Sequence, residues 1–122
     1  MVEEVVAVDI QDRTLEFGVR ILKFADKLPK TQSGNVLARQ LVRSGTSIGA
    51  NMEEADGAAT KRDFINKVII SRKEARETRY WLRLIKKAQI IYKEDNLDDL
   101  IQESHELMKI LSSIANKARG SL

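Results

Sequence analysis

The sequence predicts an all-α protein, an antiparallel up-down-up-down four-helix bundle, on three observations. Ala, Glu, Lys, Leu and Arg make up 44% of the 122 residues and there is a single proline, a composition typical of long helices. Apolar residues recur at helical spacing in four successive segments. The links between these segments are short, so neighbouring helices should run antiparallel. We expect one bundle domain over residues 12–120, preceded by an N-terminal extension over 1–11.

The first helix is predicted to begin at Asp12, as N-cap, and to end at about Leu28, before Pro29. It carries two apolar stripes about 120° apart. One stripe consists of Leu15, Val19, Leu22 and Ala25. The other consists of Phe17, Ile21, Phe24 and Leu28. An outer helix of a monomeric bundle needs only one stripe, so the second indicates burial against another subunit or a central position within the chain.

The second helix is predicted from about Asn35 to Ala58. Its inward residues are Leu37, Leu41, Ile48, Met52 and Ala55. Gly45 and Gly49 lie on nearly the same face, and each interior glycine costs about 1 kcal/mol relative to alanine. Close approach of a neighbouring helix is the plainest reason for them. A phosphate-binding loop is not indicated, because no lysine follows Gly49 and no strand precedes the segment.

The third helix should start at Thr60, which with Asp63 forms a capping-box-like pair, and should continue to about Ala88. Its core stripe consists of Phe64, Val68, Ser71, Ala75, Thr78, Leu82 and Ile85. The middle of this stripe is small, which would match the glycines of the second helix if the two helices cross there. Trp81, at the border of the stripe, is expected to be a packing anchor.

The fourth helix should begin at Asn96, which with Asp99 resembles a capping box, and should end at Gly120. Its apolar stripe consists of Leu97, Leu100, Ile101, Ser104, Leu107, Met108, Leu111, Ile114, Ala115 and Ala118. The four segments together account for most of the chain.

The main functional clue is a row of five cations on the third helix, here called the basic row. It consists of Arg72, Arg76, Arg79, Arg83 and Lys86, spaced four, three, four and three residues apart. Such like-charge neighbours each cost roughly 0.2–0.5 kcal/mol, so the row disfavours its own helix by about 1–2 kcal/mol. Residues 60–92 hold ten basic and only three acidic side chains. Carboxylates of another helix or subunit, or an external polyanion, must therefore offset the row.

Two interpretations remain open. In the first, the basic row is the nucleic-acid-binding site, and the partner is structured or duplex nucleic acid, because six aromatic residues mostly assigned to packing make a base-stacking platform improbable. In the second, the row is neutralised within a structural or protein-interaction scaffold that has no nucleic-acid role. The carboxylates available for that pairing are Glu53, Glu54, Asp56, Glu103 and Glu106.

Nothing in the sequence predicts an enzyme. The absence of cysteine excludes a disulfide framework, a thiolate zinc site and a thiol nucleophile. His105 is the only histidine and no acidic residue stands three positions before it, which excludes a di-iron carboxylate bundle. We predict no catalytic residue, metal, cofactor or small-molecule substrate. Without a signal-peptide pattern or a membrane-length apolar run, a cytoplasmic protein is expected.

Three ordered blocks resemble one family. They are LVRSGTSIGANMEEA at 41–55, KRDFI at 61–65 and RKEARETRYWLRLI at 72–85. These blocks are similar to the bacterial four-helix bundle proteins named for the 23S rRNA intervening sequence, which are related to the accessory protein of diversity-generating retroelements. The resemblance implies an antiparallel bundle that assembles as a ring-like homopentamer without enzymatic activity, some relatives working with RNA and reverse transcriptase. The leading expectation is thus a homo-oligomer, a pentamer, that binds structured RNA through its basic row.

Overall fold

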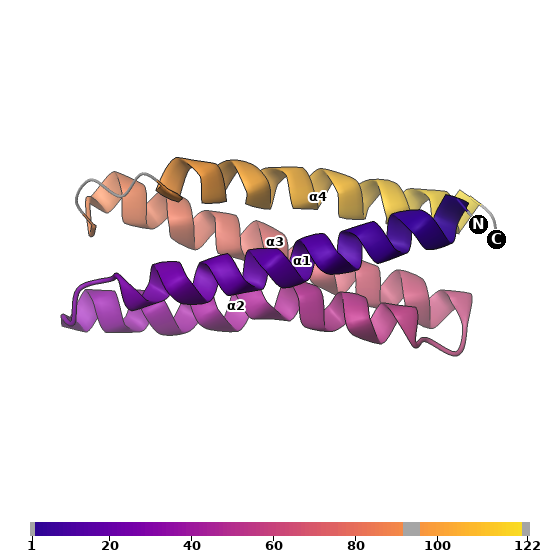
Figure 1. Cartoon of the computed structure of the whole chain (residues 1–122), viewed down its shortest axis with the longest axis horizontal. Coiled ribbons are helices and arrows are strands. Elements are labelled where there is room, and N and C mark those ends of the chain that lie inside the picture. The colour runs from indigo at the N-terminus through magenta and orange to yellow at the C-terminus, as the bar shows by residue number, and fades with distance from the viewer. Residues whose placement is uncertain (1, 92–95, 121–122) are drawn as a thin grey trace.

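The computed structural model describes residues 2–91 and 96–120, with side chains from residue 10 onward. Four helices follow one another: α1 (Val2–Asp26), α2 (Gln32–Asp56), α3 (Lys61–Ala88) and α4 (Asn96–Gly120). Figure 1 shows them side by side along one long axis, each running opposite to its predecessor, so that α1 begins at the end of the bundle where α4 finishes. The predicted all-α, up-down-up-down fold is confirmed. In the described ranges no helix is long and apolar enough to cross a membrane.

The predicted start of the first helix was wrong, because α1 begins at Val2 and not at Asp12. An N-cap residue needs non-helical backbone, whereas Asp12 lies inside the helix with its side chain exposed. No glycine or proline occurs between Val2 and Gln11 to interrupt the helix. A capping-type residue alone therefore did not mark a helix end.

Two threonines begin the middle helices. The Thr60 hydroxyl accepts a hydrogen bond from the Asp63 N–H at 3.1 Å, which confirms the predicted start of α3. Thr31 does the same for the Gly34 N–H at 3.1 Å, so α2 starts three residues before the predicted Asn35. The Thr31 cap lacks the acidic or amide residue of a capping box three positions later, and this is why the sequence pattern did not reveal it.

Side chains from all four helices meet in one apolar core. The predicted inward residues of α2 are all buried. Of the two stripes on α1, the one that contains Phe17 and Phe24 belongs to the core, with exposures of 1% and 2%. In the other stripe Leu15, Val19 and Leu22 point outward and are exposed by 66%, 37% and 45%, whereas Ala25 is buried. We call these three residues the outer apolar stripe.

The close approach predicted from the glycines of α2 is present, but the neighbour is α1. A Cβ on Gly45 would lie 2.7 Å from Ile21 Cγ2, and one on Gly49 would lie 3.3 Å from the Thr14 carbonyl. The expectation that these glycines face the small residues of α3 was wrong. Helix α2 instead presents its glycines to α1 and a different face to α3.

The contact between α2 and α3 is made by small polar side chains. The Ser71 hydroxyl donates to the Ile48 carbonyl at 2.8 Å. The hydroxyls of Ser44 and Thr78 lie 2.9 Å apart, and both residues are buried. These hydrogen bonds let the two helices approach closely without leaving buried hydroxyls unpaired.

Gly45→Ala should lower the free energy of unfolding, although alanine is the better helix former. Helix propensity favours the variant by about 1 kcal/mol, but overpacking a core costs about 1–3 kcal/mol, and Ile21 is fully buried. The matched control is Gly18→Ala, whose new methyl meets nothing closer than 4.0 Å. It should raise stability by up to about 1 kcal/mol. Urea denaturation measures both, and equal stabilisation by the two variants would contradict the close contact.

Candidate nucleic-acid interface

The basic row runs along the side of α3 that borders α4. Arg76, Arg83 and Lys86 are exposed, whereas Arg72 and Arg79 are half-buried. At one end of the row the Lys86 ammonium lies 2.6 Å from Asp98 Oδ1 of α4. This ion pair shows which residues of the two helices are opposite one another.

The Lys86–Asp98 pair gives the register of α3 against α4, and in this register one nitrogen of Arg79 and one of His105 lie between the two helices. Seven residues are close to two helical turns, so stepping back by seven on α3 and forward by seven on α4 places Arg79 opposite His105. Arg79 Nε and His105 Nδ1 are both shielded from solvent and have no hydrogen-bond partner in the described part of the chain. The middle of the basic row therefore lies beside polar nitrogens that no carboxylate among the described residues satisfies.

The four arginines of the basic row have no carboxylate oxygen within 4.0 Å in the described part of the chain. Of the acids proposed to neutralise the row, Glu103 instead binds Arg13 of α1 through two hydrogen bonds of 2.7 Å. Glu106 pairs with Lys109 of its own helix at 3.1 Å. Lys86 is the one cation of the basic row that is paired within residues 10–91 and 96–120, and such an exposed pair contributes no more than about 1 kcal/mol.

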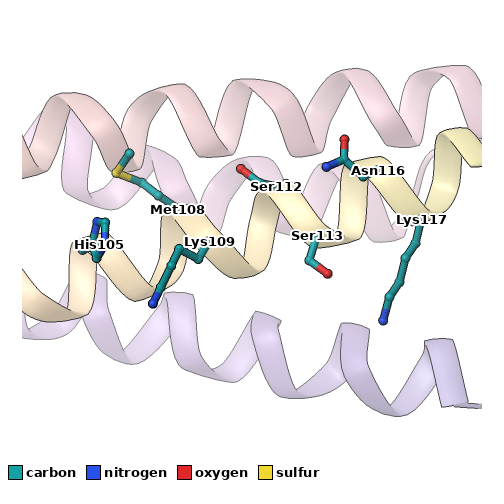
Figure 2. A pocket seen from close by; sticks show the side chains of 7 residues that line it. All are labelled: His105, Met108, Lys109, Ser112, Ser113, Asn116 and Lys117. Carbon is teal, nitrogen blue, oxygen red and sulfur yellow. The ribbon is translucent and has the colours of Figure 1, made fainter.

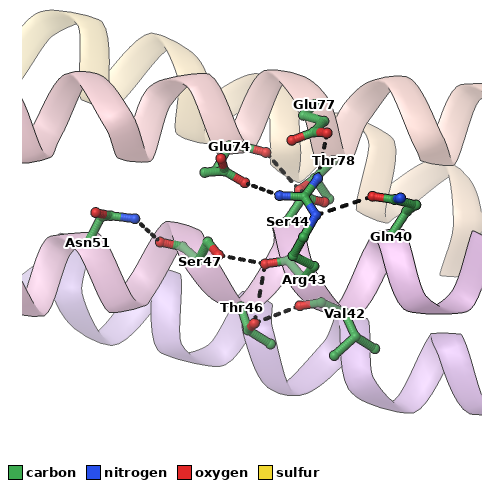
Figure 3. A network of polar contacts seen from close by, with 10 residues as sticks. All are labelled: Gln40, Val42, Arg43, Ser44, Thr46, Ser47, Asn51, Glu74, Glu77 and Thr78. Carbon is green, nitrogen blue, oxygen red and sulfur yellow. Dashed lines mark hydrogen bonds and ion pairs between the residues drawn. The ribbon is translucent and has the colours of Figure 1, made fainter.

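The acidic residues on the other flank of α3 are held by α2. Arg43 donates to Glu74 at 3.3 Å, to Glu77 at 2.5 Å and to Gln40 at 3.2 Å, as Figure 3 shows. The hydrogen bond from Arg43 lowers the pKa of Glu77, against the opposing effect of partial burial. The same bond raises the pKa of Arg43. Two of the three acids of α3 are thus turned to α2, while the side bordering α4 stays positive.

The sequence reasoning did not single out Arg43 as a partner of these acids. Glu74 and Glu77 are spaced three residues apart, which places both on one helical flank. This spacing was the signal in the sequence for a cation on the neighbouring helix.

Farther along α2, Asn51 donates from Nδ2 to the Ser47 carbonyl at 2.8 Å within the same helix (Figure 3).

A shallow depression follows the outer face of α4 and contains no acidic side chain. Its lining residues are His105, Met108, Lys109, Ser112, Ser113, Asn116 and Lys117. In Figure 2, Met108 and Asn116 point toward α3, whereas Lys117 points toward α1. Among the described residues, His105 Nδ1 has no hydrogen-bond partner. Within residues 10–91 and 96–120, no three His, Asp or Glu side chains are grouped to hold a metal ion.

The exposed aromatic residue of α3 is Tyr80, which is 55% exposed on the outer face. Its ring meets the Trp81 ring edge-on, with centroids 5.2 Å apart and an angle of 70°. Trp81 is partly buried against the core, in agreement with its predicted packing role. Tyr80 was not among the predicted site residues.

Comparison with known proteins identifies a family and similar solved structures. The family model described as "23S rRNA-intervening sequence protein" matches residues 7–113. A crystal structure of a protein of unknown function from the S23 ribosomal protein family of Bacteroides thetaiotaomicron is 40% identical to the chain, with a TM-score of 0.83. The match covers 91% of this chain and 98% of that one. No functionally curated protein matches the sequence significantly.

The Arg43–Glu77 pair should stabilise the fold at neutral pH and cease to do so in acid. Because the folded pKa of Glu77 is lowered, its contribution is complete above the unfolded pKa and is lost as the pH falls through the folded pKa. The wild-type melting temperature should therefore approach that of Glu77→Gln between about pH 5 and pH 3. The difference at pH 7 should correspond to no more than about 1 kcal/mol, since the carboxylate is one-third exposed.

Glu54→Gln removes an exposed carboxylate with no ion pair in the described ranges and controls for the loss of one negative charge. Thermal unfolding followed by circular dichroism at several pH values makes the comparison. A gap between wild type and Glu77→Gln that stays constant with pH would contradict the role of the pair.

Proposed function

This chain belongs to the family of 23S rRNA-intervening sequence proteins, and from that premise we propose that it is a non-enzymatic homo-oligomer that binds structured RNA, or another structured nucleic acid, through its basic row. One observation carries the proposal: four arginines lie on one rigid helix without a carboxylate partner among the described residues. Their mutual repulsion disfavours α3. A polyanion that binds there would relieve it.

Arginine on a long helix suits a phosphate backbone. The guanidinium group donates paired hydrogen bonds to phosphate oxygens and remains charged at all physiological pH values. Arg76 and Arg83, both exposed, are separated by two helical turns, or about 10.5 Å along the axis. Half-buried Arg72 and Arg79 extend the same line. The row thus offers spaced contacts to a backbone of fixed geometry.

A structured partner fits better than a long single strand. Proteins that bind single strands without sequence preference stack successive bases on several aromatic rings, and α3 exposes only Tyr80 to this extent. Recognition through backbone and shape needs no such series of rings. The resemblance to the accessory protein of diversity-generating retroelements supports the same class of partner.

The outer apolar stripe supports self-association. Leu15, Val19 and Leu22 lie four and three residues apart on α1 and are exposed in the single chain. Burying a large aliphatic side chain contributes about 1.5–3 kcal/mol, so a second copy that covers the stripe would gain several contacts at once. The resemblance favours a pentamer.

The alternative function is a structural or protein-interaction scaffold with no nucleic-acid role. It depends on the basic row being neutralised within the assembly. In the described part of one chain this holds for Lys86, which pairs with Asp98, and not for the four arginines. Carboxylates of another subunit could still supply the pairing, and RNA titration separates the two functions.

The double variant Arg76→Gln/Arg83→Gln should bind a labelled RNA hairpin more weakly and with a smaller salt dependence. The slope of log affinity against log salt is negative, and each lost phosphate contact reduces its magnitude by roughly one unit. The magnitude should therefore decrease by about two in the double variant. Fluorescence anisotropy at several salt concentrations measures both quantities. Absence of wild-type binding at low salt would end the proposal.

The matched control is Lys23→Gln/Arg39→Gln, which removes two exposed cations from α1 and α2. It lowers the net charge by the same amount, from +3 to +1. If binding depends on the basic row, the control should stay close to wild type. Equal weakening by the two double variants would show that only net charge matters.

Leu15→Glu/Leu22→Glu should dissociate the assembly and leave each chain folded. Both residues are exposed in the single chain, so new carboxylates cost little there, but they would be buried between subunits. Light scattering gives the molar mass and circular dichroism the helix content. Phe17→Glu is the contrasting variant and should unfold the chain, because Phe17 lies in the core. A monomeric wild type at micromolar concentration would refute self-association.

A further inference from the structure

We infer that Tyr80 is a stacking site for one unpaired base of the bound RNA, so that the protein selects hairpin loops or bulges over uninterrupted duplex. This inference rests on the proposed function and adds a substrate class to it. It starts from an exposed ring that packing within the chain does not account for.

The ring of Tyr80 is positioned and largely free. Its edge-on contact with Trp81 has a centroid distance of 5.2 Å, and Trp81 packs against the core. Tyr80 is therefore propped by an anchored residue, while 55% of its surface remains exposed. A partly immobilised aromatic ring loses little conformational entropy when a base stacks on it.

The surroundings of Tyr80 are cationic. Arg76 and Arg83 precede and follow it by four and three residues, which makes them its neighbours on the helix surface. Lys73 and Lys87 lie two turns away on either side, and all four of these cations are exposed. The acidic neighbour at this spacing is Glu77, which Arg43 of α2 already holds. A base on the ring would thus bring its flanking phosphates to the arginines.

The same charges argue against a contact in which this face meets the same face of a second copy of the chain. Two such faces in contact would bring arginines and lysines of like charge together, which is unfavourable. The outer apolar stripe on α1 offers self-association a surface with far fewer cations. A nucleotide has the two properties that complement this face, a flat apolar ring and an adjoining negative charge.

A single exposed ring accommodates one base and not a series. That base must be unpaired, since a base within a duplex already stacks on its neighbours, and the phosphates beside it must stay in a structured backbone that the basic row can follow. Hairpin loops and bulges present both features. A fully paired hairpin offers only the phosphates.

The experiment compares two labelled RNA hairpins that differ by one bulged 2-aminopurine, against wild type, Tyr80→Phe and Tyr80→Ala. Wild type and Tyr80→Phe should prefer the bulged hairpin about tenfold or more and should quench the 2-aminopurine emission by stacking. Tyr80→Ala should bind both hairpins equally, with the emission no longer quenched and the affinity for the paired hairpin unchanged. Leu84→Ala, which truncates a neighbouring apolar side chain that is 37% exposed, is the matched control and should keep the preference.

The outcomes distinguish the inference from the function beneath it. If wild type binds both hairpins equally, or if Tyr80→Ala keeps the preference and the quenching, the inference is overturned while RNA binding stands. If neither hairpin binds at low salt, the proposed function fails as well. Dissociation of the oligomer by Tyr80→Ala, seen in light scattering, would identify the ring as a subunit contact. Should Tyr80→Ala prove unfolded, Tyr80→Leu repeats the test with an apolar side chain that cannot stack.

Discussion

The arrangement of charge in this bundle depends on the contact between Arg43 of α2 and two acids of α3. The spacing of Glu74 and Glu77 places this negative charge on one flank of α3, and Arg43 binds both carboxylates there. The opposite flank keeps the basic row, with only Lys86 paired among the residues described. The contact is modest in free energy because it is partly exposed. Its larger effect is on where the remaining charge lies.

Packing reinforces this separation. The hydroxyls of Ser44 and Thr78 lie next to the Arg43 contact and are buried, which brings the backbones of α2 and α3 close together. On the far side of α3, the nitrogens of Arg79 and His105 remain without partners at the seam with α4. Buried polar nitrogens of this kind are costly to leave unpaired. Trp81 Nε1, on the flank of α3 that carries Glu74 and Glu77, is likewise without a partner among the described residues.

The fold was predictable from the sequence because its signals are local and periodic. Thr60 began α3 as expected, and every residue predicted for the inward stripe of α2 is buried, although the stripe also contains Ser44. The start of α1 was not predictable from Asp12, because a capping residue marks a helix end only where the backbone departs from the helix. The glycines of α2 indicated a close neighbour but could not identify it, since the choice between α1 and α3 depends on tertiary packing.

The position of the candidate site was predictable from the sequence, but the contacts of the residues around it were less so. The spacing of the basic row placed its five cations on one side of α3, but the pairing of Glu103 with Arg13 joins residues far apart in sequence. No periodic pattern reports such a pair. The exposure of Tyr80 was missed because most aromatic residues were assigned to packing. Its neighbours at helical spacing include Arg76 and Arg83, which was a local signal that the ring lies on the solvent side of α3.

The middle of α2 packs closely against two helices at once. Gly45 and Gly49 contact α1, while Ser44 and the Ile48 carbonyl form hydrogen bonds with α3. A larger side chain on either face of this stretch would push α1 or α3 away, so the stretch has little freedom to diverge during evolution. The outer face of α3 is under no such restriction. Relatives that share this bundle can therefore acquire different recognition surfaces on α3 while the contacts in the middle of α2 stay the same.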